Sequence, residues 1–240
     1  MLAFEGERED RASEWLLSSL LPLDFLERTY YGWRLGALGG HALRVAAYSY
    51  VISEAYGLSQ ITCERYRLAG AFHDIGKLLL PERLLDKPSS LENSERREIE
   101  AHTLKGYKLL IGSGDKQLQE AATVALHHHE CVDGSGYPNG LVGDAIALSA
   151  RIVSVADVFD ALSSDRPYRA ALTEEESVKW ISQRAGVCFD KAVVDAFMFG
   201  RHSYPDLLPR LHWFTDHAEE RVVGFERLDE DLPDIWNLTS

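Results

Sequence analysis

The most informative stretch of the chain reads His127-His128-His129-Glu130-Cys131-Val132-Asp133-Gly134-Ser135-Gly136-Tyr137-Pro138, which places adjacent imidazoles directly before a loop rich in helix-breaking residues. A second dense cluster lies upstream and reads His73-Asp74-Ile75-Gly76-Lys77. Adjacent residues of a helix point about 100° apart, so the two side chains of each pair can line one wide pocket. We therefore predict that the two clusters are the halves of a metal-centred phosphate site.

Asp74 is the residue on which the predicted site depends. A carboxylate has two oxygens, so Asp74 is able to bridge two metal ions, and paired ions bind the attacking and leaving oxygens of a phosphoryl displacement. Three further donors, His41, His102 and Asp157, each lie on another predicted helix. Mixed imidazole and carboxylate ligation predicts two divalent ions, with Fe or Mn expected first and Zn or Ni also compatible.

Apolar residues recur at helical spacing through nearly the whole chain. The pattern predicts helices over residues 38–56, 59–73, 93–111, 115–129 and 146–163, and two more that begin after the capping residues Thr173 and Asp190. Residues 131–145 are rich in Gly and Asp and are expected to form a loop. No alternating apolar run indicates a strand, so the expected fold class is an all-α helical bundle with the metal site in its core.

The clusters all lie in the middle of the chain, and the two ends differ from it. Residues 36–200 are predicted to form the catalytic domain. Residues 1–35 carry aromatic residues and several leucines, so we expect a helical segment packed on that domain. Residues 201–240 contain three prolines and an acidic end, and we expect an appended tail that docks through Trp213, Phe214 and Trp236.

The composition excludes several classes of protein. A net charge of −13 argues against binding a nucleic-acid polymer, which needs many Lys and Arg facing phosphates. The three cysteines, Cys63, Cys131 and Cys188, form no CxxC pair, and their odd number predicts reduced thiols in a cytoplasmic protein. No apolar signal core begins the chain. The most apolar early run, residues 15–26, is too short to span a bilayer, so no membrane insertion is expected.

Many ordered blocks of the chain resemble the HD-GYP family of bacterial cyclic-di-GMP phosphodiesterases, a branch of the HD metal-dependent phosphohydrolase superfamily. The similarity covers residues 38–200 and implies an HD-domain helical bundle. Its marks are His41-Ala-Leu-Arg44-Val, His73-Asp-Ile-Gly-Lys77, Leu85-Asp-Lys87-Pro88, His102 with Gly106, His128-His-Glu130, Asp133-Gly-Ser-Gly-Tyr-Pro138, Ala150-Arg-Ile-Val-Ser-Val-Ala-Asp157, Phe159-Asp-Ala-Leu162 and Asp165-Arg-Pro-Tyr-Arg169.

The resemblance implies a role for each matched residue. One ion would be held by His41, His73, Asp74 and Asp157. The other would be held by His102, His128 and His129, with Asp74 shared. Asp74 would orient a hydroxide that bridges the ions, and Lys77 would stabilise the charge that develops on the scissile phosphate. The residues that contact the cyclic dinucleotide substrate would be Gly136, Tyr137, Pro138, Asp160, Arg166 and Arg169.

One position departs from the family pattern. Some members carry a Glu one turn before the first His, where it ligates a third ion, whereas this chain has Ala37, whose methyl group cannot ligate. The resemblance then implies a two-metal centre that linearises cyclic-di-GMP to pGpG. One alternative is a weakly active or inactive sensor or scaffold that acts through a GGDEF-type or other signalling protein. Another alternative is hydrolysis of a different nucleotide, such as a hybrid cyclic GMP-AMP.

Each of these residues, taken alone, has a plainer interpretation. A single histidine is more often a hydrogen-bonded core or surface residue, Arg166 and Arg169 could be surface charges, and Gly-Tyr-Pro could be an ordinary turn. The ordered set is what favours metal ligation. His127, the first of the three adjacent imidazoles, is expected to lie on another helix face and not to bind an ion.

Overall fold

The computed structural model describes residues 36–216 except 86, 88–91, 112–115 and 166–169. This part of the chain contains no strand and only two isolated bridges, Asp133–Val142 and Ala185–Phe189, so the predicted all-α class is confirmed. Its elements are α3 (Gly36–Ala55), α4 (Gln60–Ala71), η2 (Ile75–Leu79), α5 (Glu82–Leu85), α6 (Asn93–Glu100), α7 (His102–Ile111), α8 (Lys116–His127), η3 (Gly143–Ala145), α9 (Leu148–Ser163), α10 (Glu174–Ser182), α11 (Lys191–Ser203) and α12 (Leu207–Asp216).

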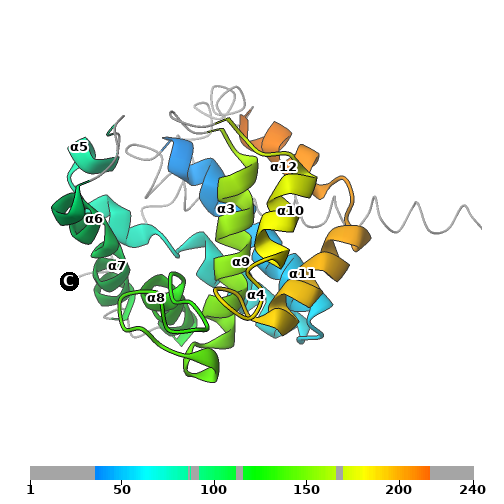
Figure 1. The fold of residues 1–240 in the computed structure, drawn as a ribbon, viewed down its shortest axis with the longest axis horizontal. Helices are drawn as coiled ribbons and strands as arrows, with labels where there is room; N and C mark the ends of the chain where they lie inside the picture. The colour runs from blue at the N-terminus through cyan, green and yellow to red at the C-terminus, as the bar shows by residue number, and fades with distance from the viewer. Residues whose placement is uncertain (1–35, 86, 88–91, 112–115, 166–169, 217–240) are drawn as a thin grey trace, which may run out of the picture.

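Two long helices, α3 and α9, pack side by side at the centre of the bundle (Figure 1). Helix α3 also packs against α4, α11 and α12, while α8 packs against both α4 and α7. Small and branched side chains such as Ala46, Ala47, Ile152 and Val155 are fully buried between these helices. The core therefore joins a group built on α3 and α9 to a group built on α7 and α8, and the predicted metal ligands come from both groups.

Local sequence signals set several of the helix ends as predicted. The side chain of Ser59 accepts a hydrogen bond from the backbone N–H of Thr62 and caps α4. Thr173 and Glu176 form a reciprocal capping box at α10, and Asp190 caps α11. These contacts satisfy backbone N–H groups that a helix start leaves without partners.

The prediction of one helix over 93–111 is wrong in one respect, because the helix is broken at Ala101 into α6 and α7. Nδ1 of the His102 ring lies 2.7 Å from the carbonyl oxygen of Ile99. At the break, this side chain therefore competes with backbone N–H groups for a carbonyl oxygen. Helix α8 likewise ends at His127, two residues earlier than predicted. Both changes place candidate ligand histidines at helix ends.

The predicted boundary at residue 200 falls inside α11, which continues to Ser203. Helix α12 follows and buries Leu207 and Leu211 against the core. Residues 1–35, the side chains of Trp213 and Phe214, and Trp236 lie outside the described residues. Among the helices that the structure describes, none has the length and apolar content needed to cross a membrane.

The expectation of three reduced thiols is corrected by the fold. Cys131, at the start of the 131–145 loop, forms a disulfide with Cys188, and Cys63 is left as a buried free thiol. The two chain segments also run together through backbone hydrogen bonds from Val132 and Asp133 to the carbonyls of Cys188 and Val187. An odd number of cysteines does not exclude one pair, and their proximity arises from contacts between distant segments that spacing does not reveal.

Substituting Cys131→Ser is expected to lower the free energy of unfolding of the oxidised protein by about 2–4 kcal/mol, because the bridge closes a long loop in the unfolded chain. Urea denaturation measures this difference. Reductant should destabilise the wild-type protein by a similar amount and leave the variant unchanged, which makes the variant its own control. A wild-type protein that responds to reductant no more than the variant would contradict the bridge.

Candidate metal centre

The seven predicted ligands converge from five helices that are far apart in the sequence. All are buried except His129, which is partly exposed. They comprise His41 on α3, His73 and Asp74 in the turn between α4 and η2, His102 at the first position of α7, His128 and His129 directly after α8, and Asp157 on α9. Five of the seven lie at or just beyond helix ends, and His41 and Asp157 lie within α3 and α9.

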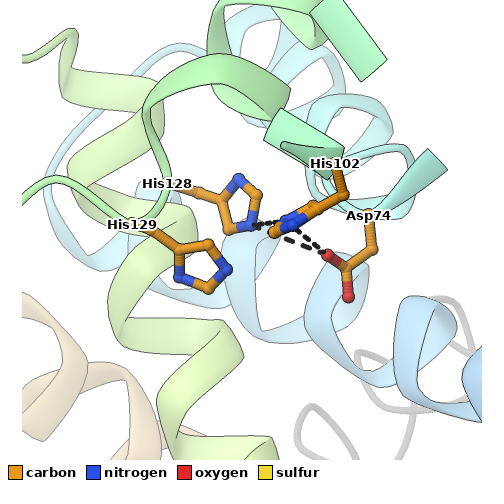
Figure 2. Close-up of side chains that lie close together, drawn as sticks. All are labelled: Asp74, His102, His128 and His129. Atoms are coloured by element: carbon orange, nitrogen blue, oxygen red, sulfur yellow. Dashed lines mark hydrogen bonds and ion pairs between the residues drawn. The ribbon is translucent and has the colours of Figure 1, made fainter. Parts of the chain in front are cut away.

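Asp74 lies at the middle of this cluster and its two oxygens face different histidines. Oδ1 is 3.2 Å from Nε2 of His102 and 3.7 Å from Nε2 of His128. Oδ2 is 3.3 Å from Nε2 of His73 and 3.9 Å from Nε2 of His41. Figure 2 shows the first of these sides, with His102, His128 and His129 gathered around the carboxylate. This is the arrangement that a carboxylate shared between two ions requires.

The donor atoms fall into overlapping groups in which every atom lies within 4.8 Å of the others. Asp74 belongs to two of the groups, and a further one joins the two sides of the cluster. The groups are Asp74, His102, His128 and His129; His41, His73 and Asp74; and His73, His128 and Asp157. Nitrogen and oxygen donors in this mixture suit divalent first-row metals.

Hydrogen bonds to the far side of the rings prepare three of the imidazoles for ligation. Each places Nδ1 2.7–3.0 Å from a backbone carbonyl oxygen one turn earlier: His73 on Gly70, His102 on Ile99 and His128 on Val124. A carbonyl oxygen only accepts hydrogen bonds, so Nδ1 carries the proton and Nε2 keeps its lone pair toward Asp74.

Two buried atoms at the centre accept or donate no hydrogen bond, namely Nε2 of His73 and Oδ1 of Asp74. A buried polar atom without a partner costs stability, and such atoms call for an explanation. A divalent cation on each side of Asp74 would satisfy one of these atoms. The residues present therefore fit a metal ion.

Residues 33–193 match the family described as HD domain, and this segment contains all seven ligand candidates. The chain belongs to the HD domain family. The chain is 39% identical over 201 residues to the cyclic di-GMP phosphodiesterase response regulator RpfG of Xanthomonas campestris pv. campestris, and the match covers 84% of this chain and 51% of RpfG. The resemblance to the HD-GYP family is confirmed at this level.

Two further relatives complete the comparison. The chain is 37% identical over 175 residues to the 3′3′-cGAMP-specific phosphodiesterase 2 of Vibrio cholerae, covering 70% of this chain and 34% of that protein. A crystal structure of a cyclic GMP-AMP-specific phosphodiesterase of Vibrio cholerae shares the fold, with a TM-score of 0.55 at 19% identity, over 71% of this chain and 45% of that one. The chain spans between a third and about half of the relatives' length.

Neighbouring residues at the centre of the HD domain differ in their protonation states, because their surroundings shift their pKa values in different directions. Burial alone would raise the pKa of Asp74, but the ammonium group of Lys77 beside it lowers that pKa well below its usual range. Burial lowers the pKa of His128 to about 4, so this ring is neutral at pH 7. Burial also opposes the charged form of His41, yet hydrogen bonds to Asp157 and Asp160 outweigh it and raise the pKa of His41 to about 9. In the metal-free protein, His41 thus carries a proton where an ion would bind.

Metal binding at pH 7.5 is therefore expected to release close to one proton from His41, and the apparent affinity is expected to rise with pH up to about pH 9. The sign follows from a raised folded-state pKa, since the proton is present below pH 9 and must leave before Nε2 ligates. Calorimetric titration with Mn²⁺ in buffers of different ionisation enthalpy measures the number of protons. Heats that do not depend on the buffer would contradict a protonated His41.

The loop after α8 is fastened beside His129. The Tyr137 ring lies 4.8 Å from the His129 ring, centroid to centroid, at an interplanar angle of 31°. A Cβ atom on Gly136 would lie 2.3 Å from the backbone nitrogen of Cys131, so only glycine allows this approach. The buried carboxylate of Glu130 accepts hydrogen bonds from the backbone N–H groups of Asn139 and Leu141, at 2.7 and 3.0 Å. Tyr137 thus forms part of the wall of the centre, and Pro138 is exposed next to it.

The structure corrects the role expected for Asp160. This residue is fully buried, and its oxygens are taken by Nδ1 of His41 at 2.7 Å and by Nε of Arg44 at 2.6 Å, so it faces a candidate ligand and has no exposed surface for a nucleotide. Lys77 lies at the edge of the centre, where Nζ donates to Oδ2 of Asp74. The expected substrate contacts of Arg166 and Arg169 lie outside the described residues.

Arg44 and Glu130 are site residues to which sequence reasoning gave no role, although both stand in the quoted blocks. A signal was present for Arg44, because it follows His41 by three residues as Asp160 follows Asp157 by three. Residues at this spacing share a helix face, so the pattern places one charged residue beside each of two candidate ligands, but it does not show that the two charges pair. His127 belongs to none of the ligand groups among the described residues, and its Nε2 lies 3.2 Å from Nδ2 of Asn139.

Proposed function

We propose that this chain is a metal-dependent phosphodiesterase that hydrolyses cyclic-di-GMP to pGpG at a two-metal centre. The observation that carries the proposal is Asp74, whose two oxygens each face a separate set of imidazole Nε2 atoms. One ion is assigned to His41, His73 and Asp157, the other to His102, His128 and His129, with Asp74 shared. Fe or Mn are the expected ions, and Zn or Ni suit the same donors.

Bound ions of this kind acidify a shared water and withdraw charge from phosphate oxygens. The other roles in the reaction are assigned to side chains of this protein. Asp74 orients the water toward phosphorus, and Lys77, which reaches Asp74 at the edge of the centre, stabilises negative charge on the phosphate. Tyr137, beside His129, presents an aromatic face to the substrate.

The choice of substrate rests on the relatives. The chain is 39% identical to a protein named for cyclic di-GMP, over 84% of its length, which favours that substrate. A second candidate is 3′3′-cGAMP, because the Vibrio cholerae relative that is 37% identical is named for it. A GGDEF-type or other signalling protein is proposed as a partner of the chain. The cytoplasmic location expected from the sequence stays a prediction.

Product analysis tests the proposed function. Metal-free protein is loaded separately with Fe²⁺ under anaerobic conditions, Mn²⁺, Zn²⁺ and Ni²⁺, incubated with cyclic-di-GMP or 3′3′-cGAMP, and the products are separated by chromatography. We expect pGpG, with faster turnover of cyclic-di-GMP. Faster turnover of 3′3′-cGAMP would favour the second candidate. Tight nucleotide binding without any product would overturn the enzyme in favour of a sensor or scaffold.

Replacing Lys77 by methionine is expected to lower kcat by about 10²–10³-fold, the range seen when one donor to a developing charge is removed. Lys77 is not among the ligands, so the content of bound metal, measured by elemental analysis, should stay unchanged. Lys105→Met is the matched control, because the Lys105 ammonium donates to the backbone carbonyl oxygen of Leu79 and not to a side chain of the centre. Equal turnover in the two variants would remove Lys77 from the reaction.

A further inference from the structure

His41 differs from the other oriented imidazoles in what holds its far nitrogen. The Nδ1 atoms of His73, His102 and His128 lie against backbone carbonyls, whereas Nδ1 of His41 lies 2.7 Å from a carboxylate oxygen of Asp160. A carboxylate fixes the ring and the tautomer as a carbonyl does, and it adds a full negative charge that makes Nε2 a stronger donor to a metal. The two sides of the centre are therefore not equivalent.

Asp160 is in turn held by Arg44. Nε of Arg44 donates to Oδ1 at 2.6 Å, and a second guanidinium nitrogen donates to Oδ2 at 3.1 Å. The same guanidinium nitrogen lies 3.3 Å from Oγ of Ser164. Asp160 has no exposed surface and Arg44 is 7% exposed, so both charges are removed from solvent and depend on each other. The pair bridges α3 to α9, next to one ligand on each helix.

We propose that Arg44 and Asp160 are a positioning pair that holds His41 as the stronger donor of one ion of the centre. The inference rests on the two-metal centre proposed above. In this role the pair acts through His41, because the two oxygens of Asp160 face His41 and Arg44. The ion at His41, His73 and Asp157 is then bound more tightly than the ion at His102, His128 and His129.

The chain offers a sharp substitution at Asp160. Asp160→Asn keeps the size of the side chain but leaves one oxygen for the two donors, His41 and Arg44. The amide N–H₂ group then faces one of these two donors and cannot accept its hydrogen bond. Equilibrium dialysis against Mn²⁺, with elemental analysis of the bound metal, should give two ions in the wild-type protein. In the variant we expect one ion at wild-type affinity and one bound about 10–100-fold more weakly.

Two further variants separate positioning from folding. Arg44→Lys keeps the charge and loses the two-pronged contact, so we expect a smaller loss for the same ion, which keeps the test open if Asp160→Asn does not fold. Glu174→Gln is the matched control, since it breaks a part-buried carboxylate–arginine pair, with Arg201 at 2.5 Å, on helices that carry no ligand. This control should bind both ions as the wild-type protein does. In ¹⁵N spectra of labelled histidine, the metal-loaded wild-type protein should show His41 protonated at Nδ1.

The outcomes separate this inference from the proposed function. Unchanged affinity for both ions in Asp160→Asn and Arg44→Lys would overturn the positioning pair and leave the two-metal enzyme standing. Equal weakening of both ions would also overturn it, because the pair would then support the whole centre and not His41. A wild-type protein that takes up no Mn²⁺, Fe²⁺, Zn²⁺ or Ni²⁺ would overturn the inference and the proposed function together.

Discussion

Replacing Asp74 by asparagine is expected to remove the binding of both ions and to lower turnover by on the order of 10⁴-fold, the scale seen when a site loses a residue on which its other groups depend. Asparagine has the same size, but it has one oxygen, whereas the two ions would each need an oxygen of residue 74. Its N–H₂ group cannot ligate a metal ion. Elemental analysis of the protein and product formation from cyclic-di-GMP measure the two effects.

The control for this substitution is Asp190→Asn. Asp190 caps α11 through one oxygen and pairs with Arg151 through the other, away from the centre; asparagine also caps helices and keeps an acceptor for Arg151, so the change from carboxylate to amide should leave the metal content unchanged. An Asp74→Asn protein that still binds two ions would show that Asp74 does not bridge them. Retention of one ion would indicate a terminal ligand in place of a shared one.

Replacing Gly76 by alanine is expected to lower the free energy of unfolding by about 3 kcal/mol or more, at the upper end of what overpacking costs. A Cβ atom at this position would lie 1.9 Å from the carbonyl oxygen of His102 and 2.6 Å from the backbone nitrogen of Gly106. Both atoms belong to the backbone of α7, which cannot turn aside as a side chain would. Relief of the clash requires η2 and α7 to separate, and this moves Asp74 away from His102.

Chemical denaturation and metal content together test the effect of Gly76→Ala. Gly57→Ala is the control, because Gly57 has a φ of 90° but no atom within 4 Å of an added Cβ, so it reports backbone strain alone, about 1–2 kcal/mol. A cost at Gly76 no greater than that at Gly57 would contradict the close approach of η2 to α7. Normal stability combined with lost metal would instead indicate that the clash is absorbed within the centre.

The sequence is sufficient to predict the helical class, because it depends on short-range patterns, and to single out the seven donor residues that the structure brings together, while their ligation of a metal stays a prediction. Helical periodicity needs only a few turns of chain, and His73-Asp74 and His128-His129 are adjacent pairs. The roles of Asp160 and Arg44 depend on a contact between residues more than a hundred positions apart. Helix spacing shows that Asp160 shares a face with Asp157, but it does not tell what that face meets.

The break at Ala101 and the pairing of Cys131 with Cys188 could not be predicted from the sequence, because both depend on contacts made in the folded protein. At Ala101 the local preference for a continuous helix competes with a side-chain hydrogen bond from His102, whose strength depends on the ring being held in place by the centre. The cysteines meet because the 131–145 loop packs on the segment after α10, a long-range contact with no pattern of its own in the sequence.

The convergence of ligands from separate helices also links metal supply to the survival of the protein in the cell. Ions that bind only the native arrangement stabilise it by mass action, by about 2.7 kcal/mol when the free ion is at 100 times its dissociation constant. Most domains have only a few kcal/mol to spare, so scarcity of the ion would enlarge the unfolded fraction that proteases degrade. The amount of this protein would then follow the availability of the metal, in addition to any control of its activity.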